Sequence, residues 1–131
     1  MNKIIFIAGT LLGVLAIILG AFATHGLKPQ LSFDMQQTFE TGVKYQMYHA
    51  FFLFFLGSLK MLSNKSKRII CYLVLIGVLF FSGSIYGLAT NALTNFDFKS
   101  IGFITPIGGL ILIIAWLLLL INFLKMKFDK S

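Results

Sequence analysis

The chain has 131 residues and a formal net charge of +7, and 58% of its residues are hydrophobic while only 11% are charged. This composition leaves no room for a soluble domain, so we expect residues 1–131 to form one transmembrane domain. The basic residues border apolar stretches, where they meet anionic lipid headgroups, and this placement argues against nucleic acid as a partner. The single cysteine, Cys71, excludes an internal disulfide and a thiolate metal cage.

Four apolar stretches occupy most of the chain, at residues 4–24, 45–62, 69–89 and 102–124. Each is close to the ~20 residues that a helix needs to cross ~30 Å of hydrocarbon. A helix is also one of the few structures that satisfy their own backbone groups in lipid. The sequence therefore predicts an all-α fold, an integral membrane four-helix bundle.

The first stretch could be read as a signal peptide, because Lys3 precedes the apolar run and small residues follow it. A stripe of small residues along one helix face favours a retained span instead, since such a face packs closely on a neighbouring helix. The stripe consists of Gly9, Gly13, Ala16 and Gly20.

The basic residues predict the orientation of the four spans. Eight of the 11 fall on the side of the two termini and the 64–68 connection, namely Lys3, Lys60, Lys65, Lys67, Arg68, Lys125, Lys127 and Lys130. The other side holds Lys28, Lys44 and Lys99. By the positive-inside rule both termini face the cytoplasm. We expect the clusters at 65–68 and 125–130 to anchor on headgroups, with a partner-binding patch as the alternative.

The 24–44 connection is the longest one, and two interpretations of it stay open. Asp34 can cap a helix that has Gln37 at its third position. Met35, Phe39 and Val43 then recur at intervals of four and form an apolar stripe. The segment is either a short amphipathic helix at the outer interface or an extension of the second span.

Polar side chains within the spans gather toward the outer end, and we predict that they converge on a polar site, which either binds a partner or ties the helices together. They are His25, Gln46, His49, Ser82, Ser84, Tyr86 and Thr105. His49 could relay a proton or bind a metal, but we expect it to tie helices together through hydrogen bonds. Two histidines without a nearby acid or thiol in the spans do not make a metal site.

Gly83 and Gly87 form a G-x-x-x-G pair in the third span, which predicts a second close-packing face. Trp116 is expected to face lipid or to pack, since no haem, flavin or nucleotide signature accompanies it, and no cofactor is predicted. Ser82 and His49 lack an orienting carboxylate within the spans, so a nucleophile and base pair is not expected. The chain is therefore predicted not to be an enzyme.

Four motifs in order resemble one known family. They are GAFATHGL at 20–27, FETGVKYQMYHA at 39–50, FSGSIY at 81–86 and TPIGG at 105–109, followed by Trp116. They are similar to the signatures of the family catalogued as domain of unknown function 423, small four-span membrane proteins that include the YgdD-like and YwdK-like proteins. The resemblance covers essentially the whole chain and departs locally at Ala23 and Thr24, where the family often has Gly-Ala. It implies an integral plasma-membrane protein of bacteria and gives no reaction.

These patterns predict a non-enzymatic protein that supports membrane or envelope integrity, with membrane lipids and a membrane protein or a second copy as expected partners. The alternative is a small oligomeric transporter or channel that couples protons at His49.

Overall fold

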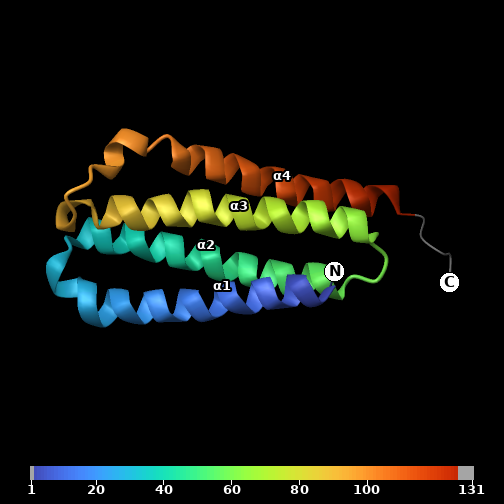
Figure 1. Ribbon diagram of the computed structural model, residues 1–131, viewed down its shortest axis with the longest axis horizontal. Helices are drawn as coiled ribbons and strands as arrows, with labels where there is room; N and C mark the ends of the chain where they lie inside the picture. The colour runs from blue at the N-terminus through green and yellow to red at the C-terminus, as the bar shows by residue number, and fades with distance from the viewer. Residues whose placement is uncertain (1, 127–131) are drawn as a thin grey trace.

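The computed structural model describes residues 2–126, and its four long helices run antiparallel to one another in chain order (Figure 1). They are α1 (Asn2–Phe22), α2 (Phe33–Ser58), α3 (Asn64–Ala89) and α4 (Ile104–Lys125). Each helix packs against the next one, and α1 and α4 form the two edges of the arrangement. The predicted all-helical fold is confirmed.

Three segments are long and apolar enough to cross a membrane, namely Asn2–Gln30, Asn64–Ala89 and Phe98–Lys125. Helix α2 is not among them, and its polar residues include Asp34, Glu40, Lys44, Gln46 and His49. Its 26 residues rise about 39 Å, which exceeds the ~30 Å of hydrocarbon. The polar first turns can therefore project beyond the apolar layer while the remainder lies beside α1 and α3.

Of the two interpretations of residues 34–44, the structure supports the extension of the second span, since α2 is continuous from Phe33 to Ser58. The N-cap is Ser32, whose hydroxyl accepts from the Met35 amide at 3.2 Å, and not Asp34. The apolar stripe that suggested contact with headgroups is only partly covered by the protein, since Met35 is exposed and Val43 is half-buried. Phe39 is buried, and its ring centroid lies 4.8 Å from that of Tyr86.

The ends of the helices differ from the predicted spans by a few residues. Regular α-helix ends at Phe22 and continues as a π-helical turn (Ala23–Leu27) and a 3-10 turn (Lys28–Gln30). Helix α2 ends at Ser58 rather than at residue 62, and Ser63 caps α3 by accepting from the Ser66 amide. Two 3-10 turns, Asn91–Leu93 and Phe98–Ile101, join α3 to α4. Lys127 and Lys130, which entered the orientation prediction, lie outside the described residues.

The bundle has two unlike halves. We call the half that holds residues 2 and 126 the terminal half, and the half that holds residues 23–32 and 90–103 the loop half; the loop half corresponds to the predicted outer side (Figure 1). The main apolar core includes Ile5, Leu53, Leu56, Ile70 and Val74, all almost fully buried. A smaller cluster of Leu27, Phe39 and Ala89 closes the loop half.

Candidate functional site

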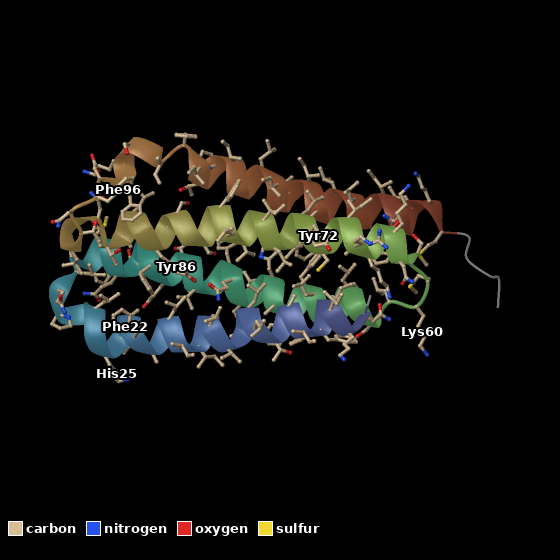
Figure 2. The ribbon with its side chains drawn as sticks, viewed as in Figure 1. Phe22, His25, Lys60, Tyr72, Tyr86 and Phe96 are labelled. Carbon is tan, nitrogen blue, oxygen red and sulfur yellow. The ribbon has the colours of Figure 1, made fainter. Side chains whose placement is uncertain are left out.

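Six of the seven predicted polar residues lie between helices, from the loop half to the middle of the bundle, where hydrogen bonds connect them to one another, to Trp116 or to backbone carbonyls. We call this set the polar seam, and it consists of Gln46, His49, Ser82, Ser84, Tyr86, Thr105 and Trp116. His25 does not join it. That residue is exposed on the π-helical turn and points away from the other helices (Figure 2), so its assignment to the cluster is wrong.

Gln46 links three helices. The Tyr86 hydroxyl of α3 donates to Gln46 Oε1 of α2 at 2.6 Å, and Gln46 Nε2 donates to the Leu12 carbonyl of α1 at 2.9 Å. Gly42 makes room for this contact, because a Cβ there would lie 2.7 Å from Tyr86 Cε1. The absence of one side chain on α2 therefore lets the tyrosine ring lie against its backbone.

Two serines of α3 extend the polar seam in opposite directions. Ser82 is buried, and its hydroxyl donates to the Gly42 carbonyl of α2 at 2.8 Å. The Ser84 and Thr105 hydroxyls lie 2.5 Å apart and join α3 to α4. Without its bond the Ser82 hydroxyl would be an unsatisfied polar group in lipid, whereas the Ser84 hydroxyl also donates to the Phe81 carbonyl at 3.0 Å.

His49 joins α2 to α4 and has a defined tautomer. Its Nδ1 lies 2.7 Å from the Tyr45 carbonyl, which can only accept, so Nδ1 carries the proton. Its Nε2 lies 3.1 Å from Trp116 Nε1, whose N–H can only donate, so Nε2 accepts. Both ring nitrogens are therefore occupied, and this pairing does not favour the alternative of proton-coupled transport.

The polar groups of the seam are used in hydrogen bonds, most of which join one helix to another. Among residues 2–126, no buried side-chain nitrogen or oxygen lacks a hydrogen-bond partner. No three His, Cys, Asp or Glu side chains gather closely enough in this part of the chain to hold a metal. Ser82 bonds the Gly42 carbonyl and His49 bonds Trp116. The two residues do not bond each other, so they do not form a pair of nucleophile and base.

The two predicted small-residue faces have different surroundings. On α1, a Cβ at Gly9 would lie 3.0 Å from the Phe54 ring, and one at Gly20 would lie 3.5 Å from Val43. Gly13 faces Ala50 and Ala16 is buried, so this stripe lies against α2. On α3 the two glycines do not share a partner helix. Gly87 lies against the Phe98 ring in the loop, whereas Gly83 is exposed beside open space.

Two grooves flank the polar seam. The α1–α3 groove has a volume of about 400 Å³ and is lined by Leu12, Leu15, Leu19, Gln46, Leu75, Val78, Leu79, Ser82, Gly83 and Tyr86. The α2–α4 groove has a volume of about 310 Å³ and is lined by Tyr45, His49, Phe81, Gly109, Leu112, Ile113 and Trp116. Both are predominantly apolar, and both contain polar groups that are already hydrogen bonded.

Lys67 was expected to reach headgroups, but only 3% of it is exposed. Its Nζ donates to Asn2 Oδ1 at 3.0 Å and to the Gly57 carbonyl at 3.4 Å. A cation at the last carbonyls of α2 complements the negative end of that helix. The sequence did contain a signal, because Lys67 shares a helix face with Ile70 and Val74, which are buried.

The long apolar helices and the hydrogen bonds between them define an all-helical membrane protein. Comparison with known proteins agrees, because the family model described as "Protein of unknown function (DUF423)" matches residues 19–109. The chain belongs to this family.

Curated relatives cover almost the whole chain. The "UPF0382 membrane protein SH2409" of Staphylococcus haemolyticus is 37% identical over 123 residues, which is 94% of this chain and 97% of that protein. The "UPF0382 membrane protein YwdK" of Bacillus subtilis is 35% identical over 125 residues, 94% of this chain and 98% of that protein. A UPF0382 membrane protein of Haemophilus influenzae is 38% identical over 115 residues, 88% and 89% of the two chains. No solved structure matches the chain.

Proposed function

We propose that this chain spans the bacterial cytoplasmic membrane four times and supports membrane integrity as a non-catalytic helical scaffold, acting through lipid or protein contacts. The observation that carries the proposal is the polar seam. Its hydrogen bonds connect all four helices, and every buried side-chain nitrogen or oxygen among residues 2–126 has a hydrogen-bond partner. A set of side chains used in this way favours a fixed scaffold over a catalyst.

The charges support an orientation with both termini in the cytoplasm. The described basic residues of the terminal half are Lys3, Lys60, Lys65, Lys67, Arg68 and Lys125, and those of the loop half are Lys28, Lys44 and Lys99. The acids Asp34, Glu40 and Asp97 lie in the loop half as well. An excess of Lys and Arg favours the cytoplasmic side.

Reporter fusions test this orientation. Alkaline phosphatase is active only after export, so it should be inactive when fused after residue 131 and active when inserted between Asn95 and Phe96. The reverse pattern would contradict the proposed orientation. Activity at both positions would contradict a fourfold crossing.

A deletion strain tests the role in membrane integrity. We expect faster entry of a membrane-impermeant dye under hypo-osmotic shock, with restoration by the wild-type chain. His49→Gln should also restore the barrier, because a scaffold needs no proton carrier at this position, and its membrane level would be measured to exclude loss of the protein. Unchanged dye entry and membrane potential in the deletion strain would contradict the proposal.

A further inference from the structure

The α1–α3 groove opens at the side of the bundle, between α1 and α3, and not at its ends. Leu15 of α1 and Leu79 of α3 stand at its walls with 49% and 66% of their surfaces exposed. Gln46 and Ser82 lie at its floor and are buried. In a bilayer the mouth of this groove therefore faces lipid.

Gly83 keeps the wall of the groove open. A Cβ at this position would meet only Leu79, at 3.9 Å. The other two glycines of α3 have close partners, since a Cβ would lie 2.6 Å from Leu112 at Gly77 and 2.6 Å from Phe98 at Gly87. A glycine within a helix costs about 1 kcal/mol relative to alanine, and no packing contact within the described chain offsets this cost at Gly83.

Contacts between elements of the bundle lie beyond both ends of the groove. In the loop half, Leu19 and Tyr86 line the groove and also pack against the cluster of Leu27, Phe39 and Ala89. In the terminal half, Ile5 is fully buried in the main core, and Asn2 of α1 accepts from Lys67 of α3. An occupant therefore has to enter from the side.

The surroundings and the size of the groove narrow the choice of occupant. Water would find few partners, because the polar groups of the floor already bond one another and backbone carbonyls. A helix of a second copy would cross ~30 Å of hydrocarbon. The groove runs along α3 from Leu75 to Tyr86, a rise of only about 17 Å, so it is too short to hold the full length of such a helix. Its volume of about 400 Å³ well exceeds that of an apolar cavity of about 150 Å³ that takes up benzene.

We propose that the α1–α3 groove is a lateral binding site for the hydrocarbon tail of a membrane lipid. The inference rests on the proposed membrane-spanning arrangement and names the lipid contact through which the scaffold acts. Gly83 provides the space for the tail, and Leu15 and Leu79 form the two sides of the entrance. The hydrogen-bonded floor holds the walls apart at a fixed distance.

Photolabelling in bilayers tests the site. The purified full chain is reconstituted into phosphatidylethanolamine and phosphatidylglycerol nanodiscs that contain a phosphatidylcholine with a diazirine in the middle of one acyl chain. After irradiation, mass spectrometry locates the labelled residues. We expect labelling of the groove residues of α1 and α3 to exceed, several-fold, that of Leu110 and Leu117, which are exposed on α4.

Two substitutions at the groove are compared with a matched control. Gly83→Leu fills the wall and should lower groove labelling several-fold. Ala21→Leu adds a leucine to an exposed position of α1 that does not line the groove, and labelling should be unchanged. Leu79→Trp narrows the exposed entrance and gives a second test if Gly83→Leu does not fold.

Even labelling of all exposed helix faces would overturn the inference, because it would indicate annular lipid only. Weaker labelling of the groove than of Leu110 and Leu117 would mean that protein rather than lipid covers it, as in self-association, and would also overturn it. Either result leaves the proposed integrity function standing if the deletion strain leaks. A deletion strain with a normal barrier, in contrast, would contradict the function whatever the labelling pattern.

Discussion

The terminal and loop halves of this bundle are held together by different interactions. In the terminal half, large apolar side chains such as Leu53, Leu56 and Ile70 fill the space between helices, and Lys67 is the buried cation. In the loop half, side-chain hydrogen bonds cross from helix to helix, Gly42 lets the Tyr86 ring lie against α2, and Gly108 lets the backbones of α3 and α4 come close.

This difference indicates how the alignment of neighbouring helices along their axes is fixed in lipid. Lipid tails are as apolar as leucine, so apolar contacts alone distinguish poorly between one helix register and another. A hydrogen bond such as Tyr86 to Gln46 is satisfied at only one register. We infer that the loop half specifies the alignment of the helices while the terminal half contributes close packing.

The largest effect should come from Gly108→Ala. A Cβ there would lie 2.7 Å from the Phe80 carbonyl carbon, so α3 and α4 must separate. We expect a loss of about 2–3 kcal/mol in unfolding free energy, measured by denaturant titration in bicelles. Gly109→Ala is the control, since its Cβ would lie 3.6 Å from the Phe81 ring and should be tolerated. Equal stability of the two variants would contradict the close contact.

Leu53→Ala tests the terminal half. Leu53 has no exposed surface, yet we expect a loss of only about 1–2 kcal/mol, below the 2–5 kcal/mol typical of water-soluble cores. The reason is that the unfolded helices remain in lipid, so packing contacts are lost without transfer to water. Leu117→Ala, at a half-exposed position, should change stability little in the same titration. A larger loss of unfolding free energy for Leu117→Ala than for Leu53→Ala would contradict the assignment of Leu53 to the core.

His49→Leu tests the contact between α2 and α4. Trp116 is the only tryptophan, so its fluorescence reports directly on the loss of its acceptor. We expect a changed emission maximum and a loss of about 1 kcal/mol. His25→Leu should leave the emission unchanged because His25 is exposed on the π-helical turn. An identical spectrum for His49→Leu would mean that the two rings are not bonded.

Ser84→Ala should have the smallest effect. Its bond to Thr105 is half-buried near the end of the bundle, and bonds of this kind between membrane helices average about 0.6 kcal/mol. Thr105→Ala should cost a similar amount, and the double variant should cost little more than either single one. Fully additive losses in the same titration would show that the two hydroxyls do not interact.

Hydrophobic patterning predicted the helical class and most of the apolar helices, because long apolar runs have few alternatives in lipid. It did not predict the continuity of α2, since polar residues at 34–44 match an interfacial helix and an extended one equally well. His25 was misplaced because membership of a span does not define which way a side chain points. The acceptor of Trp116 lies 67 residues away in the chain and the side-chain acceptor of Lys67 lies 65 residues away, so no local pattern identifies either partner.

The central claim is that the polar seam fastens the helices, and a double-mutant cycle on Gln46 and Tyr86 tests it most directly. The unfolding free energies of Gln46→Leu, Tyr86→Phe and the double variant would be measured in bicelles and compared with wild type. We predict a coupling energy of about 0.6–1.7 kcal/mol, the range of hydrogen bonds between membrane helices. A coupling energy of zero would contradict the claim and would leave the polar seam without its proposed role.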